Sequence, residues 1–242
     1  MRLTYIYHSG FAIEGENFTI IIDYYRDSDG ENDGIVHDSL LHRAGKLYVL
    51  STHSHSDHFN PEILKWKQHR PDIQYIFSRD ILEDRHVRFD GAVYLSPSEL
   101  YHDNTLCIQA FGSTDVGCSF LIEVAGKLIF HAGDLNNWHW KEESTMEESA
   151  EYEAAYLHEL EILARVTNRF DLVMFPIDPR LGREYMLGAE QFVCRFAVGC
   201  FAPMPFHDQY EKAAAFRSFA EKNGSLFIGW SFPGETVELP DY

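Results

Sequence analysis

The chain begins with short hydrophobic stretches of the length and composition typical of β-strands. Leu3, Tyr5 and Tyr7 alternate with other residues, and 18–22 is a continuous apolar and β-branched run that ends at Asp23. Further short apolar runs predict strands, with Ala125-Gly126 as a hairpin turn between the last two, at 47–50, 73–77, 92–95, 105–111, 118–124 and 127–131.

Helical spacing appears first after residue 60 and becomes frequent in the last third. Asn60 as N-cap and Pro61 at the first helical position predict a helix through His69. A capping-box pattern at Ser144 and Glu147 opens an acidic helix, expected to be an outer, solvated one. Its apolar positions are Met146, Ala150, Ala154, Leu157, Leu160 and Ala164.

The remaining segments alternate between the two patterns. Strands are predicted at 171–177, 200–206 and 226–229, and helices at 187–196 and 209–222, the latter capped by Asp208 and closed by Asn223-Gly224. Strands in hairpins followed by strands that alternate with helices indicate sheets covered by helices. With 242 residues, no repeat and no linker composition, we expect a single domain over residues 1–242.

Composition excludes several classes of protein. The net charge of -18 argues against a nucleic-acid partner, which would require clustered Lys and Arg. Neither a run of roughly 20 apolar residues nor a signal-peptide pattern is present, so we expect a cytoplasmic protein without a membrane span. The four dispersed cysteines are expected to be reduced core residues. Part of the negative charge is local, in Glu142, Glu143, Glu147, Glu148, Glu151, Glu153, Glu159 and Glu161.

The chemistry concentrates in one short segment, where a predicted buried strand gives way to a helix. His53, His55, Asp57 and His58 lie within six residues. Residues two apart in an extended segment face the same way, so His53 and His55 can reach one ion together. The turn into the helix directs Asp57 and His58 toward a second ion. The segment therefore predicts a two-metal site.

The order of motifs resembles the metallo-β-lactamase superfamily along nearly the whole chain. Asp23 at the end of an early strand, the His53 to His58 motif, Gly133-Asp134 after a strand, and His207 after Pro205-Phe206 all follow the family pattern. The opening Tyr7-His8-Ser9-Gly10-Phe11 is similar to the branch of L-ascorbate-6-phosphate lactonase and N-acyl phosphatidylethanolamine phospholipase D. The resemblance implies an α+β fold, the four-layer αββα sandwich, with Asp134 as a carboxylate shared by two metal ions and His207 as a further ligand.

One departure from the family pattern concerns the first metal site. The family places a third histidine before a strand where this chain reads 110–118 without one. Asp115 could substitute as a hard oxygen ligand and shift the preference from zinc toward manganese or iron. Alternatively His139 reaches in, or the first site is weak and only Asp57, His58, Asp134 and His207 hold an ion. We favour Asp115, with two divalent transition-metal ions as cofactors.

These residues predict a hydrolase of a small ester, lactone or phosphodiester that uses a metal-activated water, with Asp57 as the proton acceptor. Asp23 is expected to hold a ligand histidine by a hydrogen bond, and His8, like His131, to support the site from nearby. Arg180, Arg183 and Tyr185 follow a strand end where α/β folds bind ligands, and Arg183 and Tyr185 are the candidates for substrate contact.

Two other functions remain open. The missing histidine fits a metal-binding or sensory protein that has kept the fold and lost turnover. A flavin-linked diiron oxidoreductase is disfavoured, because that branch carries Glu where this chain has His55. The expected partner is a small-molecule substrate, and the sequence favours no particular oligomeric state.

Overall fold

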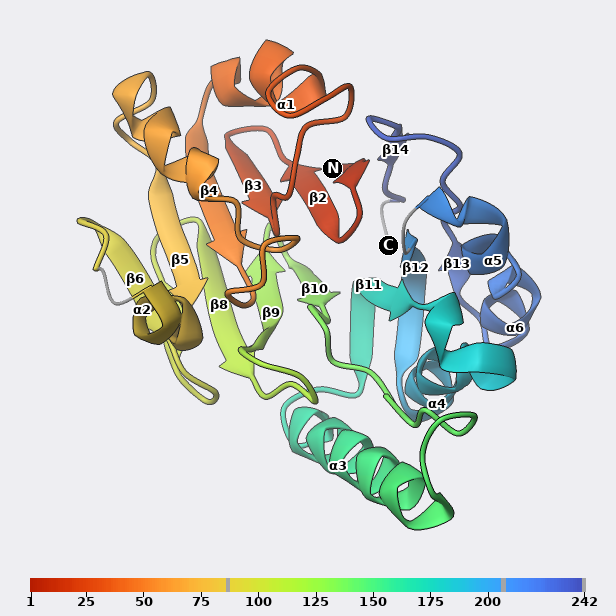
Figure 1. Cartoon of the computed structure of the whole chain (residues 1–242). Coiled ribbons are helices and arrows are strands. Elements are labelled where there is room, and N and C mark those ends of the chain that lie inside the picture. The colour runs from red at the N-terminus through yellow and green to blue at the C-terminus, as the bar shows by residue number, and fades with distance from the viewer. Residues whose placement is uncertain (86–87, 206–207, 241–242) are drawn as a thin grey trace. The chain divides into compact units, whose positions relative to one another are not determined.

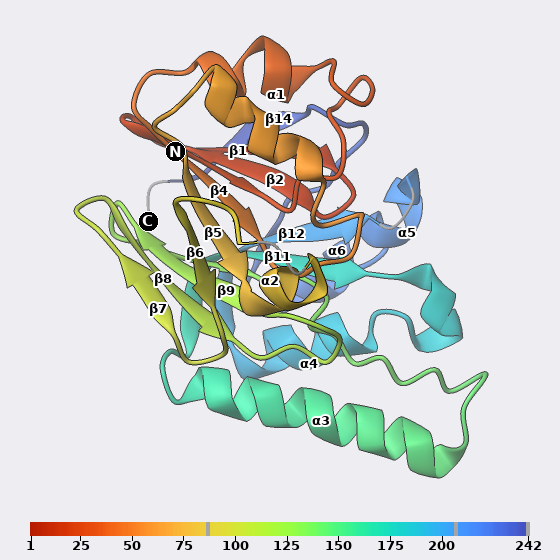
Figure 2. The same cartoon turned by 60° about the vertical axis from the view of Figure 1, so that its left-hand side comes forward.

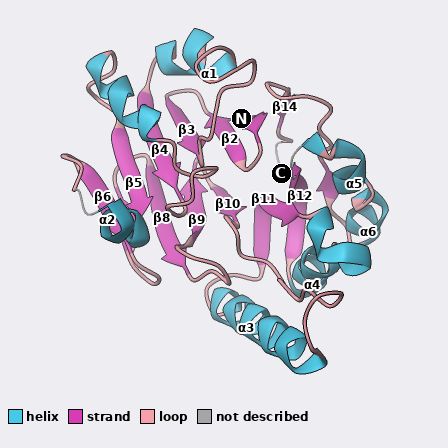
Figure 3. Cartoon of the chain, in the orientation of Figure 1, coloured by secondary structure: helices cyan, strands magenta, loops and turns pink. Residues whose placement is uncertain are grey.

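The computed structural model describes residues 1–85, 88–205 and 208–240, and these residues form two seven-stranded sheets with helices (Figure 1). The sheets belong to two compact units, one comprising Met1–Ser96 and Trp230–Tyr242 and the other Pro97–Gly229. Figure 3 distinguishes the strands from the helices of each unit. The predicted α+β class is confirmed, whereas the single domain over residues 1–242 stays a prediction.

The sheet of the first unit combines an antiparallel hairpin with a parallel half. Its order is β14-β1-β2-β3-β4-β5-β6. Strands β3 to β6 pair in parallel, so their carboxyl ends lie at one edge, where ligands of α/β sheets usually bind. The strands are β1 (Arg2–Tyr7), β2 (Gly10–Glu14), β3 (Phe18–Ile22), β4 (Lys46–Ser51), β5 (Gln74–Ser78), β6 (Ala92–Leu95) and β14 (Thr236–Glu238).

Short helices cover one face of this sheet and close its hydrophobic core (Figure 2). They are α1 (Ile35–Asp38), η1 (Leu40–His42), η2 (Pro61–Gln68) and α2 (Arg79–Arg85). Asn60 caps η2 as predicted, because its side chain accepts a hydrogen bond from the Glu62 amide at 2.9 Å. The segment forms a 3₁₀ helix, in which side chains three residues apart lie above one another. Ile63 and Trp66 therefore both face the core.

The sheet of the second unit has the order β13-β12-β11-β10-β9-β8-β7. Strands β7 to β10 are antiparallel and β10 to β13 parallel. The predicted hairpin turn is confirmed, with positive φ at Ala125 and Gly126. The strands are β7 (Leu100–His102), β8 (Leu106–Phe111), β9 (Ser119–Val124), β10 (Lys127–His131), β11 (Arg169–Ile177), β12 (Ala197–Pro205) and β13 (Leu226–Phe227).

The acidic helix of the second unit is α3 (Met146–Ala164), the longest helix in Figure 2, and its sequence interpretation needs two corrections. The capping box is formed by Thr145 and Glu148, one residue later than predicted. The predicted apolar stripe is also wrong at four of its six positions, because Met146, Ala150, Ala154 and Leu157 are exposed. The buried face instead carries Ser149, Tyr156, Leu160 and Leu163.

The other helices of this unit are η3 (Pro179–Glu184), α4 (Leu187–Arg195), α5 (Tyr210–Ala214) and α6 (Arg217–Lys222). The single helix predicted over 209–222 is wrong. The Phe216 amide bonds to the Ala213 carbonyl, an i to i−3 contact that tightens the turn and divides the segment. Asp208 does not cap it, since its carboxylate accepts from the Tyr210 hydroxyl at 3.0 Å.

Two remaining predictions bear on the chain as a whole. None of the helices in the described part of the chain combines the length and hydropathy that crossing a membrane requires. All four cysteines are free thiols, but only Cys118 and Cys200 are buried; Cys107 is half-buried and Cys194 is exposed. The expectation of core cysteines therefore holds for two of them.

Candidate metal centre

A buried carboxylate, Asp23, ties the end of β3 to the metal motif that follows β4. Its side chain is 0% exposed, and its amide donates to the Leu50 carbonyl at 2.9 Å. Oδ1 accepts from the Thr52 amide at 2.7 Å. Oδ2 accepts from the Thr52 hydroxyl at 2.6 Å and from His58 Nδ1 at 2.8 Å. One carboxylate thus fixes both the backbone and a ring of the motif.

The same carboxylate determines the tautomers of two histidines. Because His58 donates from Nδ1, its neutral ring carries the lone pair on Nε2. The Thr52 hydroxyl proton points to Asp23, so the Thr52 oxygen accepts from His53 Nδ1 at 3.1 Å. His53 therefore also carries its lone pair on Nε2. A hydrogen bond at Nδ1 with the lone pair on Nε2 is the arrangement of metal-ligating histidines in proteins.

The three motif histidines lie ring against ring. The centroids of His53 and His58 are 3.9 Å apart, and those of His53 and His55 are 4.7 Å apart. A ring nitrogen of His53 and one of His55 lie within 4.8 Å of each other. The segment turns sharply after His55, whose carbonyl accepts from the His58 amide at 3.0 Å. The turn brings the three rings together. His53 and His58 are buried, and His55 is exposed.

Asp57 lies on the other side of the motif and contacts His8 of the β1–β2 turn. His8 Nε2 is 3.0 Å from Asp57 Oδ2, and single ligand atoms of His8, Asp57 and His58 lie within 4.8 Å of one another. Burial alone would raise the pKa of Asp57, but the His8 hydrogen bond and the electrostatic influence of the neighbouring His58 and His8 imidazoles outweigh it and hold that pKa well below its ordinary range. Asp57 is therefore ionised and able to ligate a cation.

The second unit brings its two predicted carboxylates together. Asp134 follows β10 after Gly133, and its carbonyl accepts from Trp138 Nε1 at 2.8 Å. Asp115 lies exposed in the connection from β8 to β9. Their loops are joined because the Thr114 hydroxyl donates to the Asn136 carbonyl at 2.6 Å and accepts from the Asn136 amide at 3.0 Å. A carboxylate oxygen of each aspartate lies within 4.8 Å of the other.

Two further histidines of this unit are held by backbone atoms. Nε2 of His139 is 3.1 Å from the Glu184 carbonyl, and Nδ1 accepts from the Lys141 amide at 3.2 Å. His131 is buried and accepts from the Gly133 amide at 3.1 Å. Both ring nitrogens of His139 thus contact backbone groups. This favours Asp115 over His139 as the substitute ligand.

The predicted substrate contacts lie in and after η3. Arg183 is 96% exposed with Nε 3.6 Å from Glu142, and the Tyr185 hydroxyl donates to the Lys212 carbonyl at 3.0 Å. Arg180 instead forms an ion pair with Asp178 at 2.5 Å. The roles of Arg183 and Tyr185 stay predictions, and His207 lies outside the described residues.

Sequence reasoning did not single out Thr52 and Asp80. Thr52 links Asp23 to His53, and Asp80 accepts from the Ser54 amide at 2.8 Å, which holds the start of the motif loop. Thr52 directly precedes the first motif histidine, but a threonine at a strand end is common. Only the three-dimensional contact with Asp23 distinguishes it.

Comparison with known proteins supports the fold and the class of site. A family model described as a beta-lactamase superfamily domain matches residues 2–151. Over 148 residues the chain is 27% identical to a UPF0173 metal-dependent hydrolase of Desulforamulus reducens, an alignment that covers 55% of this chain and 62% of that protein. A UPF0173 metal-dependent hydrolase of Pelotomaculum thermopropionicum is 22% identical over 99% of this chain and its own full length.

A solved structure extends the similarity to three dimensions. Igni18, a metallo hydrolase of Ignicoccus hospitalis, superposes with a TM-score of 0.68 at 19% identity and covers 98% of this chain and 97% of its own. The predicted metallo-β-lactamase fold is confirmed, and the prediction of a metal-dependent hydrolase agrees with the names of the relatives. The narrower branch, with the ascorbate-phosphate lactonase and the phospholipase, stays a prediction.

Proposed function

Since the chain belongs to the beta-lactamase superfamily, we propose that it is a metal-dependent hydrolase of a small ester, lactone or phosphodiester. The observation that carries the proposal is the arrangement around Asp23. A fully buried carboxylate that sets His53 and His58 to the same tautomer has a purpose when both Nε2 atoms bind a cation. Without a cation, several buried imidazoles and a carboxylate would only add desolvation cost.

We assign the ligands by donor chemistry. His53 and His55 would hold one ion together with Asp115 and Asp134, and Asp57, His58, Asp134 and His207 would hold a second. Both sets mix imidazole nitrogens with carboxylate oxygens, which suits zinc, manganese and iron. Asp115 in place of a histidine makes the first set richer in hard oxygen donors, so we expect it to favour manganese or iron over zinc.

Bound ions would lower the pKa of a water molecule toward neutrality. The protein groups supply the rest of the chemistry. Asp57 accepts the proton of the attacking water, and His8 holds the Asp57 carboxylate through the 3.0 Å contact between Nε2 and Oδ2. Asp23 keeps His53 and His58 in their ligating tautomers. No serine or cysteine nucleophile is needed, and the substrate is a small molecule.

The proposal is tested by measuring metal content and hydrolysis on the same samples. Protein reconstituted with zinc, manganese or iron should bind up to two ions per chain and hydrolyse members of a lactone, ester and phosphodiester panel. Asp134→Ala should lower metal occupancy and activity together, because it removes a ligand of both ions. Full metal loading without hydrolysis of any substrate would instead support a metal-binding or sensory protein, and a metal content near zero would refute both.

A further inference from the structure

Arg26, in the loop that follows β3, is a half-buried arginine that forms no hydrogen bond or ion pair with the described parts of the chain. Its Nε is buried, and no described residue accepts a hydrogen bond from it. The guanidinium carbon lies 3.7 Å from the centroid of the Tyr7 ring, a cation–π contact. Arg2 and Arg43, by contrast, both pair with Glu14, at 2.6 and 2.9 Å.

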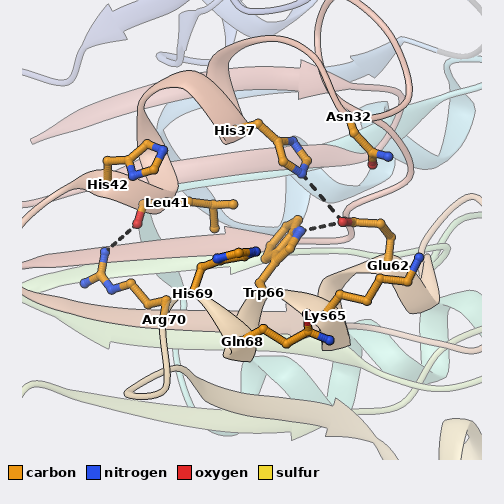
Figure 4. Close-up of a pocket in the computed structure, with 10 residues that line it drawn as sticks. All are labelled: Asn32, His37, Leu41, His42, Glu62, Lys65, Trp66, Gln68, His69 and Arg70. Carbon is orange, nitrogen blue, oxygen red and sulfur yellow. Dashed lines mark hydrogen bonds and ion pairs between the residues drawn. The ribbon is translucent and has the colours of Figure 1, made fainter.

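The acids closest to Arg26 in the loop and in the pocket beside it are engaged elsewhere or exposed. Asp27 is fully buried and accepts from the amides of Val36 and His37 and from the His37 ring. Glu62 accepts from Trp66 Nε1 at 2.5 Å and lies 3.7 Å from His37 Nε2, as Figure 4 shows. Glu31 is exposed. In a chain with a net charge of -18, a half-buried cation left without a carboxylate is unexpected.

Arg26 lines a pocket of about 440 Å³, within the size range of small-molecule sites. Lys65 supplies a second cation to its lining, Glu31 and Glu62 supply two carboxylates, and Asn60 donates a hydrogen bond to the Tyr25 carbonyl at 2.7 Å. A second pocket of about 360 Å³ shares Asn32, Glu62 and Lys65 with the first and ends against Trp66 and Leu41 (Figure 4).

A series of ring contacts connects Arg26 to the proposed catalytic carboxylate within the first unit. The rings of Tyr7 and Tyr25 stack with centroids 5.9 Å apart, and Tyr25 meets the edge of His8 at 6.1 Å. His8 in turn contacts Asp57 at 3.0 Å. The pocket therefore adjoins the residues that hold Asp57.

We propose that Arg26 binds an oxyanion, the phosphate or carboxylate group of the substrate, in this pocket. That the bound anion belongs to the substrate rests on the proposed hydrolase function, but the anion site itself does not. A planar guanidinium stacked on an aromatic ring presents a fork of donors that matches two oxygens of either group. Lys65 adds charge at the more exposed side of the pocket.

The first experiment measures anion binding without catalysis. Inorganic phosphate and succinate are titrated separately into metal-loaded and into chelator-treated protein by calorimetry. At least one should bind saturably in both forms, and Arg26→Gln should weaken that binding by about tenfold or more, as the loss of a charged hydrogen bond requires. Arg195→Gln, which removes an exposed arginine near the Phe196 ring, should bind like the wild type.

The result with each probe decides the chemistry. Saturation by phosphate alone assigns a phosphate group, and saturation by succinate alone assigns a carboxylate. Equal binding by wild type and Arg26→Gln overturns the proposal, as does the absence of saturation with both probes. If Arg26→Gln unfolds, Arg26→Lys keeps the charge without the fork, and it should still weaken binding several-fold.

The second experiment compares matched esters with and without an acidic group. The wild type should prefer the anionic ester, and Arg26→Gln should lower kcat/KM for that ester by about 10- to 100-fold, mainly through KM, with little change for the neutral ester. An equal loss for both esters would show a structural role and refute the proposal. Hydrolysis of neither ester by the wild type, together with intact anion binding, would refute the hydrolase function and leave the anion site standing.

Discussion

Two buried aspartates, Asp23 and Asp27, lie four residues apart in the loop after β3, and each accepts a hydrogen bond from a histidine. We propose that the two pairs have different roles. Asp23 Oδ2 accepts from His58 Nδ1 at 2.8 Å, and Asp27 Oδ2 accepts from His37 Nδ1 at 2.7 Å. Both carboxylates are 0% exposed. The two hydrogen bonds are nearly equal in length, although the His58 side chain is 1% exposed and the His37 side chain 21%.

The difference lies in what surrounds each pair. The other contacts of Asp23 go to Thr52 and through it to His53, and the His58 ring lies 3.9 Å from that of His53. The other contacts of Asp27 go to backbone amides at the start of α1, and the His37 ring packs against Trp66 at 5.8 Å. We therefore expect His58, whose ring meets the other proposed ligand rings, to bind metal, and His37, whose ring meets the hydrophobic core, to be structural.

The largest effect is expected at Asp57, which lies beside His58 of the first pair. Asp57→Asn keeps the size of the side chain and one ligand oxygen but cannot accept a proton. We expect a loss of about 100-fold or more in kcat with most of the metal retained. Rate and metal content are measured on the same preparation. Full activity of Asp57→Asn on a substrate of the wild type would exclude Asp57 as the proton acceptor.

Removal of Asp23 should follow in size. Asp23→Ala deprives His58 and Thr52 of their acceptor, so we expect metal affinity to fall by about 10- to 100-fold. Competition with a chelator of known affinity gives the value. The stabilisation that metal adds to thermal unfolding should shrink in parallel. Unchanged affinity would mean that the histidine tautomers do not depend on this carboxylate.

Asp27→Ala is the matched test of the second pair. Three amides and one imidazole lose their acceptor, namely those of Ser28, Val36 and His37, and the His37 ring. We expect the free energy of unfolding to fall by roughly 2–4 kcal/mol, with metal affinity unchanged. Chemical denaturation and the same chelator assay measure the two quantities. A loss of metal comparable with that of Asp23→Ala would erase the distinction between the pairs.

The smallest effect should come from Thr52→Val, which preserves shape and removes the link between Asp23 and His53. Metal affinity should fall by about tenfold, at the lower end for such supporting contacts. Thr4→Val provides the control, because Thr4 is a buried threonine of the same unit that bonds to Glu14 and Thr236. Both variants should lose some stability, but only Thr52→Val should lose metal affinity. An equal loss from both would argue against the link.

Sequence patterns predicted most of the sheet because buried strands leave a strong local signal. The runs at 18–22, 47–50 and 127–131 became strands within one or two residues of the expected ends. The strands β2, β7 and β14 were missed. Each of β7 and β14 has three residues and neither contains a buried one, whereas β2 is fully buried but was interpreted only as part of a family motif. In α3 the spacing was correct but the face was wrong, since Tyr156 and Leu163 form the buried stripe and the sequence does not specify which stripe meets the core.

The candidate site was predictable in its residues but not in its connections. The His53 to His58 motif and Asp23 stand out by type and spacing, whereas the role of Thr52 depends on a contact between positions 29 residues apart. Arg26 gave no signal at all, because an arginine in a loop is usually solvated. Its buried Nε and the engagement of Asp27 elsewhere appear only in three dimensions.

Asp23 has a left-handed backbone, with φ of 50°, which costs an ordinary residue roughly 1–2 kcal/mol. This conformation is held by the hydrogen bond from its amide to the Leu50 carbonyl and by the hydrogen bonds that its carboxylate accepts from Thr52. Leu50 lies on β4 and Thr52 directly after it. The site therefore cannot assemble until β3 and β4 have paired, which places metal capture late in folding. In a stopped-flow refolding experiment, metal uptake should be no faster than the burial of Tyr24 and Trp66. Metal uptake ahead of that burial would show that the His53 to His58 motif binds metal before the chain folds.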